Sequence, residues 1–182
     1  MANDTPEAPG AIIVMGVSGS GKTTVGVALA SRLGWRYEDA DKFHPPSNVA
    51  KMSAGHPLTD EDRWPWLRAI AAEIDRVRIT GERVIIGCSA LRRAYRDILI
   101  HGRSDVRLVY LEGTKALIAK RLARRKGHFM PPDLLDSQFT TLEPPTADER
   151  PVTVSISHPV ESTVGEILRQ LELAPAEQKQ SV

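Results

Sequence analysis

The chain has 182 residues, enough for one domain with a complete hydrophobic core. Its 24 lysines and arginines nearly balance its 23 aspartates and glutamates, which argues against a general nucleic-acid binder or a protein that lies on a membrane surface. One cysteine excludes an internal disulfide framework, and no apolar run approaches the length of a membrane span.

The first ten residues, MANDTPEAPG, have neither the basic start nor the apolar stretch of a secretory signal peptide. We therefore expect a cytoplasmic protein. The polar composition of residues 1–10 and 174–182 predicts a disordered leader and a disordered tail. A single domain is expected between them, at residues 11–173.

The first predicted element is a buried strand over residues 11–15, because AIIVM is a short continuous apolar run. GVSGSGKT follows at residues 16–23 and matches the phosphate-binding pattern G-x-x-x-x-G-K-[ST] at every specified position. Its glycines let the backbone turn tightly and present successive N–H groups to an anion. A helix is predicted after the loop, running to Leu33 with Gly34 as a left-handed stop, and its positive end should face the same anion.

We expect this loop to bind the phosphates of ATP. Lys22 can reach the β- and γ-phosphates, which also makes it a catalytic candidate, and the Thr23 hydroxyl can coordinate Mg²⁺. The residues expected to hold the nucleotide are Gly16, Ser18, Gly19, Ser20, Gly21, Lys22, Thr23 and Thr24.

Strand and helix patterns alternate along the rest of the chain. Strands are predicted at 35–38, 83–88, 106–111 and 152–156, and helices at 92–101, 114–125, 131–141 and 160–173. This alternation predicts an α/β fold of three layers, the P-loop NTPase type, in which helices cover both faces of a parallel sheet. Ligands bind beyond the carboxyl ends of such strands, so residues 16–23, 39–41 and 88–90 should share one rim.

Two stretches interrupt the alternation. Residues 41–79 hold a proline-rich loop followed by helix signals around residues 65–67, and we interpret about 42–80 as a substrate-binding insertion. The basic segment between the helices at 114–125 and 131–141 contains Gly127. We interpret about 121–132 as a mobile lid, of the kind that excludes water during phosphoryl transfer.

Two carboxylates follow the second predicted strand. Asp39 and Asp41 lie two residues apart on an extended segment, so both can point to the same side, toward the phosphates. One could hold Mg²⁺ through water, and the other could accept the proton of an acceptor hydroxyl. The alternative is a turn whose carboxylates are merely solvated.

Basic residues supply the remaining candidates. Arg121 and Arg125 lie four residues apart on one helical face and could clamp the transferred phosphoryl group, although a solvated basic face is the alternative. An anionic acceptor would need one or two further cations near the insertion, and a salt bridge is the alternative for each. The candidates for contact with the acceptor are Asp41, His44, Lys51, Arg63, Arg92 and His128.

A metal centre built from histidines and a cysteine nucleophile are not expected. The five histidines show no metal-ligand spacing. Cys88 ends an apolar strand and is interpreted as a small buried residue rather than a nucleophile.

These motifs, taken in order, resemble the gluconate kinase (gluconokinase) family, small P-loop kinases of sugar acids that are related in build to shikimate and adenylate kinases. The likeness covers nearly everything from residue 12 to residue 173. It rests on GVSGSGKT at 16–23, DKFHP at 41–45, NVAKM at 48–52, GHPLTD at 55–60, CSAL at 88–91, RKGHF at 125–129, QF at 138–139 and LEP at 142–144.

The resemblance implies ATP-dependent phosphorylation of D-gluconate at its terminal hydroxyl, to give 6-phosphogluconate. It also implies that Asp41 orients or deprotonates that hydroxyl, that Arg63 meets the substrate carboxylate, and that Asp39 holds Mg²⁺ through water beside Thr23. A homodimer is implied as well. One departure is Ala40, which stands where the family has glycine between the two aspartates.

Two other functions remain open from the residues themselves. The first is a P-loop kinase for a different small acceptor, such as a shikimate-like acid, another sugar acid or a nucleoside monophosphate. The second is a nucleotide-binding module without catalysis. A GTPase is disfavoured, because the chain has no Asn-Lys-x-Asp element to read guanine.

Overall fold

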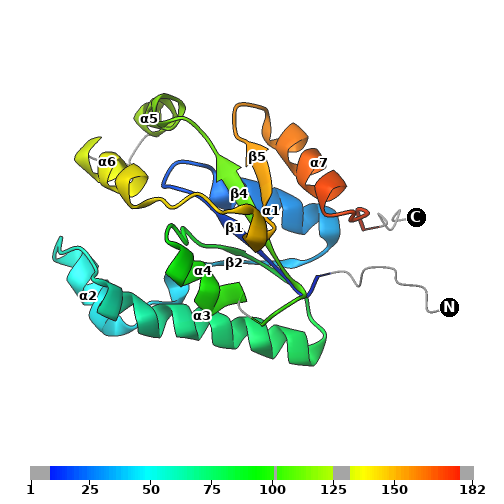
Figure 1. Cartoon of the computed structure of the whole chain (residues 1–182), viewed down its shortest axis with the longest axis horizontal. Helices are drawn as coiled ribbons and strands as arrows, with labels where there is room; N and C mark the ends of the chain where they lie inside the picture. The colour runs from blue at the N-terminus through cyan, green and yellow to red at the C-terminus, as the bar shows by residue number, and fades with distance from the viewer. Residues whose placement is uncertain (1–8, 101, 125–131, 177–182) are drawn as a thin grey trace, which may run out of the picture.

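The computed structural model describes residues 9–100, 102–124 and 132–176. Among these residues, five strands form one sheet in the order β2-β3-β1-β4-β5 (Figure 1). The strands are β1 (Ala11–Met15), β2 (Arg36–Asp39), β3 (Val84–Gly87), β4 (Val106–Glu112) and β5 (Val152–Ser155). Every neighbouring pair is parallel, which confirms the predicted fold class.

Helices cover both faces of this sheet (Figure 1). α1 and α7 pack on one face and α3 and α4 on the other, while α2, α5 and α6 lie beyond the carboxyl end of the strands. The helices are α1 (Lys22–Leu33), α2 (Pro46–Ser53), α3 (Asp60–Thr80), α4 (Arg93–Ile100), α5 (Lys115–Arg124), α6 (Pro132–Thr141) and α7 (Val160–Gln170). Two short 3₁₀ turns, η1 (Ala40–Phe43) and η2 (Ala147–Glu149), complete the described elements.

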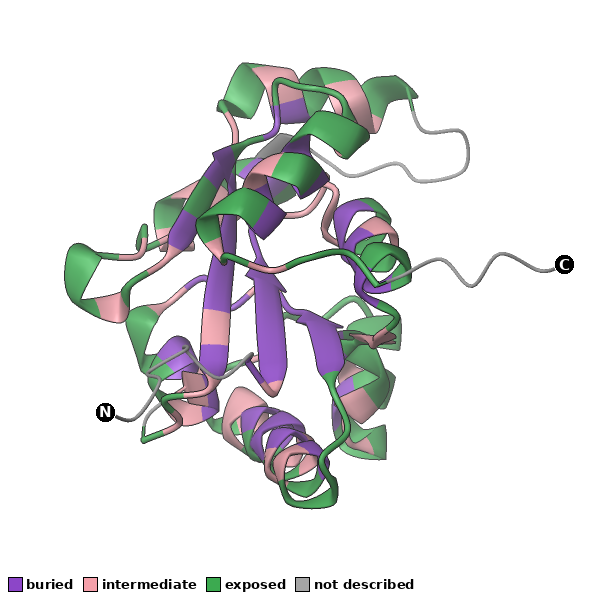
Figure 2. Cartoon of the chain, turned by 90° about the vertical axis from the view of Figure 1, so that its right-hand side faces the viewer, coloured by how far each residue is buried: buried purple, intermediate pink, exposed green. Residues whose placement is uncertain are grey.

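Successive side chains of β1 alternate between two hydrophobic cores. Ile12 and Val14 pack with residues of α1 and α7. Ala11, Ile13 and Met15 face the opposite way, toward α3 and α4. All five are fully buried, as expected for a central parallel strand, and the sheet is the buried centre of the molecule (Figure 2).

Most predicted boundaries agree with the structure to within two or three residues. Gly34 takes the predicted left-handed conformation at the end of α1, with a φ of 66°. Trp35 does not open β2 as predicted, because its N–H donates to the Ala30 carbonyl at 2.9 Å and closes the end of α1. α7 ends before the predicted Leu173, whose N–H closes that helix on the Leu168 carbonyl at 3.0 Å.

The prediction of a loop at the start of the insertion is wrong in part, since residues 46–53 form α2. Pro46 stands at the first turn of this helix, where a missing N–H costs nothing because first-turn N–H groups have no partner within the helix. The predicted helix around residues 65–67 is confirmed. It belongs to the 21-residue α3, which begins with a capping box between Thr59 and Asp62.

The described ends of the chain are held to the domain. Gly10 N–H donates to the Asp105 carbonyl at 2.9 Å, and Ala176 N–H donates to the Arg32 carbonyl at 2.8 Å. The rest of the predicted leader and tail lies outside the described residues. No described helix has both the length and the apolar character needed to cross a membrane.

Candidate functional site

The phosphate-binding loop joins β1 to α1 at the carboxyl edge of the sheet. Gly16 has a φ of 152°, and a Cβ there would lie 2.6 Å from the Ser20 hydroxyl. Gly19 has a φ of 81°, and a Cβ there would lie 2.8 Å from the Leu122 side chain of α5. Both positions therefore require glycine, and the loop can curl tightly enough to turn its N–H groups toward one anion.

The start of α1 presents positive potential at the end of this loop. No side chain caps the helix and no acidic residue stands in its first turn, which suits a bound phosphate. Thr23 and Thr24 are exposed there. The ammonium of Lys22 lies against the loop, 3.0 Å from the Gly16 carbonyl oxygen and 3.2 Å from that of Val17.

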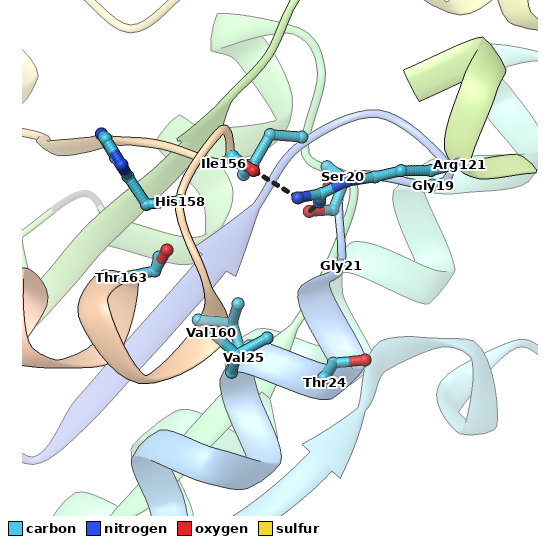
Figure 3. A pocket seen from close by; sticks show the side chains of 10 residues that line it. All are labelled: Gly19, Ser20, Gly21, Thr24, Val25, Arg121, Ile156, His158, Val160 and Thr163. Atoms are coloured by element: carbon cyan, nitrogen blue, oxygen red, sulfur yellow. Dashed lines mark hydrogen bonds between the residues drawn. The ribbon is translucent and has the colours of Figure 1, made fainter. Parts of the chain in front are cut away.

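A cavity of about 230 Å³ adjoins the second half of the loop (Figure 3). It lies between α1, α5 and the segment that joins β5 to α7. Its lining residues are Gly19, Ser20, Gly21, Thr24, Val25, Arg121, Ile156, His158, Val160 and Thr163. Arg121 reaches from α5 across the loop (Figure 3), where it donates to the Ile156 carbonyl and, at 3.5 Å, to the Ser20 carbonyl. The structure thus places this arginine beside the phosphate loop.

A residue of α6 holds the first half of the loop. Gln138 accepts from the Ser18 N–H at 2.6 Å through Oε1, and its Nε2 donates to the Ser18 hydroxyl at 3.2 Å. Ser18 does not line the cavity, so this contact lies apart from the residues around Arg121. The loop is therefore held by hydrogen bonds at two places, from Arg121 of α5 and from Gln138 of α6.

Tyr37 of β2 lies two residues before Asp39, one of the predicted metal ligands. Burial raises the pKa of its hydroxyl, the Thr23 hydroxyl lowers it, and the negative charges of Asp39 and Asp41 raise it. Thr23 stands in the first turn of α1, and the two aspartates stand at the end of β2 and the start of η1. All three therefore lie at the carboxyl edge of the sheet, the rim on which the sequence placed them.

Cys88 lies at the end of β3 in the same corner. Burial raises the pKa of its thiol to about 12; the Ala90 backbone N–H and the Lys22 charge lower it, and the Asp41 and Asp39 charges raise it. Cys88 is 1% exposed, which confirms the prediction of a small buried residue. The three charges that act on it are those predicted to surround the transferred phosphoryl group.

Thr23 and Asp39 offer the kind of ligands that Mg²⁺ prefers. No three His, Cys, Asp or Glu side chains gather as a metal centre within the described ranges. Mg²⁺ in kinases is held by one or two protein groups, by waters and by substrate phosphates, so a hydroxyl and a carboxylate beside a phosphate loop fit it. Asp39 Oδ1 also accepts from the Asp41 N–H at 3.0 Å, which fixes the carboxylate at the start of η1.

Asp41 projects from η1 with 86% of its side chain exposed. The turn that carries it is held by Trp66 of α3, whose indole N–H donates to the Ala40 carbonyl at 2.8 Å. His44 stacks on the Trp66 ring at a centroid distance of 4.3 Å and keeps only 6% of its side chain exposed. Burial lowers the pKa of His44, so its imidazole is neutral at pH 7.

The three cations predicted for the acceptor all have partners in the structure. Arg63 donates to the Leu58 carbonyl at 2.6 Å, and Arg92 pairs with Asp60 at 2.8 Å. Both guanidinium groups lie 5.9 Å from the ring of Tyr95, and both lie beside the Asp60 carboxylate, Arg63 at 3.7 Å from Oδ1 and Arg92 at 2.8 Å from Oδ2, which places them together. Lys51 is apart from them, paired with Asp62 at 2.6 Å. Arg63 and Arg92 thus form one cationic group, and Lys51 supports the start of α3.

Two predicted site residues, Arg125 and His128, lie outside the described residues, as does most of the predicted lid. Of the basic cluster at the end of α5, the structure places Arg121 at the cavity.

The sequence reasoning missed the residues that follow β5. Ile156, His158, Val160 and Thr163 line the cavity, and they stand where ligands bind in parallel sheets, beyond the carboxyl end of a strand. The same rule that selected residues 16–23 would have selected them. Gln138 carried no chemical signal of its own and stood only within a family motif.

Comparison with known families and proteins gives one consistent result. The family model described as shikimate kinase matches residues 18–169. A probable gluconokinase of Mus musculus is 46% identical, with 91% of this chain and 100% of that protein covered. The gluconokinase of Gluconobacter oxydans is 44% identical, with 90% of this chain and 92% of that protein covered.

Solved structures agree with these relatives. The crystal structure of a gluconokinase from Sinorhizobium meliloti is 45% identical and superposes with a TM-score of 0.81, covering 90% of this chain and 92% of that one. A shikimate kinase from Bacteroides thetaiotaomicron shares the fold at 19% identity, with a TM-score of 0.64 and coverage of 91% and 100%.

Proposed function

The chain belongs to the gluconokinase family of P-loop kinases, and from this premise we propose that it transfers the γ-phosphoryl group of ATP to the terminal hydroxyl of D-gluconate. The observation that carries the proposal is the likeness to gluconokinases at 44–46% identity over at least 90% of this chain. The product is 6-phospho-D-gluconate.

The donor side of the reaction uses the phosphate loop and the cavity beside it. The loop N–H groups, Lys22 and the start of α1 bind the phosphates. The adenine then enters the cavity, where Val25, Ile156 and Val160 supply apolar contacts and the Arg121 guanidinium can stack on the base or meet a phosphate. Arg125, four residues after Arg121 in the sequence, would add a second cation.

Mg²⁺ would be held by Thr23 and, through water, by Asp39. The ion would neutralise charge on the β- and γ-phosphates. The support is chemical: the Thr23 hydroxyl is exposed at the start of α1, beside the phosphate loop, and the Asp39 carboxylate ends β2 at the same edge of the sheet.

The acceptor side lies between η1, α2 and α3, so we propose that about 42–80 is the substrate-binding part of the domain. Asp41 accepts the proton of the terminal hydroxyl, and His44 lies next to it. Arg63 and Arg92 bind the gluconate carboxylate, where guanidinium groups can form paired hydrogen bonds. Both then exchange part of their present pairing for the substrate. Lys51 and, from the proposed lid at about 121–132, His128 would complete the pocket.

In the chemical step the hydroxyl oxygen attacks the γ-phosphorus in line with the bond that breaks to ADP. Lys22 and Arg121 stabilise charge on the phosphates, and the closed lid excludes water. The protein supplies position and charge rather than a covalent intermediate.

We further propose a homodimer in the cytoplasm, where ATP is available; the family likeness is the support for the dimer.

The test is ADP release by the purified chain with ATP, Mg²⁺ and a panel of acceptors. Turnover with D-gluconate well above that with shikimate, other sugar acids and nucleoside monophosphates is expected. Turnover with one of these and none with gluconate would favour the other-acceptor kinase. ATP binding without ADP release above water hydrolysis would favour the non-catalytic module.

A further inference from the structure

Asn48 is a buried amide directly behind His44. It lies on α2, four residues after the histidine, and is 3% exposed. Its Nδ2 atom is 2.8 Å from the backbone carbonyl oxygen of Asp62 and 3.3 Å from Nδ1 of His44. One amide nitrogen therefore reaches two partners, one on α3 and one at the end of η1.

The Asp62 carbonyl fixes which way this amide points. A carbonyl oxygen only accepts hydrogen bonds, so the atom facing it must be the NH₂ group of Asn48 and not its oxygen. The second hydrogen of the same NH₂ group then serves His44, and Nδ1 must accept it. A neutral imidazole whose Nδ1 accepts carries its proton on Nε2.

The surroundings of the ring keep it neutral. Burial lowers the pKa of His44, and the positive charge of Arg63 on α3 lowers it further, against the opposite effect of Asp41 on η1. From α2 the facing group is the uncharged amide of Asn48. The donor form with Nε2–H is thus maintained by an amide, a stacked indole and burial, with no ionic partner needed.

The Nε2–H group faces the carboxylate that takes the acceptor proton. Nε2 of His44 lies 4.0 Å from Oδ1 of Asp41, too far for a direct hydrogen bond. An oxygen atom beside them can lie about 2.8 Å from both. A hydroxyl group in that position donates its hydrogen to Asp41 and accepts one from His44.

We propose that Asn48 is a positioning residue that locks His44 as an Nε2–H donor, and that His44 and Asp41 together hold the reacting hydroxyl of the acceptor. The proposal rests on the proposed function. The hydroxyl group donates its hydrogen to Asp41, and one of its two lone pairs accepts the Nε2–H of His44. The remaining lone pair is then free to attack the γ-phosphorus. That oxygen–phosphorus bond forms as the bond to the β–γ bridging oxygen breaks, which leaves ADP and a proton on Asp41.

The first test reads the tautomer directly, without any substrate. ¹⁵N NMR of the histidine side chains, with His44→Gln to assign the signal among the five histidines, should show His44 neutral at about pH 7 and protonated on Nε2. A ring protonated on Nδ1, or a mixture of the two tautomers, would overturn the role given to Asn48.

The second test uses Asn48→Asp, which turns the donor into an acceptor. The new carboxylate would hold a proton on Nδ1 and raise the pKa of His44. Below that raised pKa the ring carries both protons and still donates through Nε2, whereas above it Nε2 is bare. We expect kcat to match the wild type at low pH and to fall about tenfold as the pH rises through the raised pKa.

The wild type serves as the control, because its Nε2–H is present on both sides of the lowered pKa. A loss in Asn48→Asp that is equal at every pH would indicate a purely structural role and contradict the proposal.

A matched pair of His44 variants tests the proposal if Asn48→Asp does not fold. His44→Gln can place an N–H near the position of Nε2, whereas His44→Asn can place one only near Nδ1. The glutamine variant should lose several-fold less kcat than the asparagine variant, with KM for ATP unchanged in both. Equal losses of kcat in the two variants would mean that His44 does not contact the acceptor hydroxyl. If the chain turned over no acceptor at all, the proposed function would fail with the hydroxyl contact, while the NMR result would still decide the tautomer.

Discussion

At the scale of single residues, the site is organised by charge around a buried, uncharged corner. Lys22 lowers and Asp41 and Asp39 raise the pKa of the buried Cys88 thiol, which burial raises to about 12. Lys22 opens α1, and Asp39 and Asp41 stand at the end of β2 and in η1, so charges of both signs lie at the carboxyl edge of the sheet. Such an arrangement suits a reaction in which the protein positions two substrates and balances phosphate charge.

Replacing Asp41 by asparagine should lower kcat about 100-fold and leave the affinity for ATP nearly unchanged, because the amide cannot accept the hydroxyl proton. Steady-state kinetics with ATP and gluconate measure both. The role assigned to Asp41 is wrong if the variant keeps a near-normal kcat.

Lys22→Met should reduce turnover by at least about 100-fold, since it removes a charge that stabilises the transferred phosphoryl group. The fold should persist, and circular dichroism checks it. Lys120→Met, at an exposed position of α5, is the matched control and should keep full activity. Comparable losses in the two variants would mean that Lys22 has no special place at the phosphates.

Some of these residues could be identified from sequence and others could not. The phosphate loop is a local pattern, so Gly16, Lys22 and Thr23 were predicted by spacing alone. The partners of Arg63 and Arg92 were not, because both arginines meet the Asp60–Tyr95 pair only after α3 and α4 pack together. Asn48 gave no signal, since its importance depends on the backbone of Asp62 on another helix.

At the scale of elements, the start of α3 depends on one carboxylate. Lys51 and then the Thr59 backbone N–H lower the pKa of Asp62 to about 2. A carboxylate with a lowered pKa stabilises the folded state above its unfolded value near 3.9, and this stabilisation is lost as the pH falls through the folded value.

The thermal midpoint of Asp62→Asn should therefore lie below that of the wild type at about pH 6, and the difference should shrink as the pH falls below about 4. Circular dichroism melts across this range give the result. Glu61→Gln, an exposed change in the same first turn, is the control. A difference that stays constant with pH would show that the ionised carboxylate is not what stabilises the helix start.

The link between α6 and the phosphate loop gives a second prediction at this scale. Gln138→Ala removes two hydrogen bonds to Ser18 and should raise KM for ATP by about tenfold, because the loop is no longer fixed in its binding shape. Ser18→Ala combined with Gln138→Ala should cost no more than Gln138→Ala alone. Fully additive losses in this double-mutant cycle would mean that the two residues act separately.

Elements were predicted well wherever the hydrophobic pattern or the stop signal lies within a few residues, as for β1, α1 and the cap at Gly34. α2 was missed because its prolines suggested a loop, although they stand at the one helix turn that tolerates them. The contact of α6 with the phosphate loop joins residues 120 positions apart, so no local pattern announces it.

At the scale of the whole molecule, one buried ion pair joins α4 and the residues just before it to the distant η2. Arg96 of α4 is 1% exposed and Glu149 of η2 is 6% exposed, and two hydrogen bonds of 2.5 and 2.9 Å connect them. Arg96 also donates to the carbonyls of Ala90 and Leu91, after β3. The pair thus ties the rim beside Cys88 to the segment that enters β5.

Arg96→Met should destabilise the protein by about 3–5 kcal/mol, because Glu149 is left buried without its partner. Arg93→Met breaks the neighbouring pair with Asp148, whose side chains are 45% and 60% exposed, and should cost less than about 1 kcal/mol. Urea unfolding of both variants tests the contrast. Equal costs would mean that burial of the Arg96 pair does not matter.

The central claim is that one rim of the sheet holds ATP and hands its terminal phosphoryl group to gluconate. The most direct measurement is identification of the product by ³¹P NMR after incubation of the purified chain with ATP, Mg²⁺ and D-gluconate. The account predicts ADP and a phosphate monoester on the terminal carbon of gluconate, formed in equal amounts. ADP without phosphorylated gluconate, or a phosphate on another carbon, would contradict it.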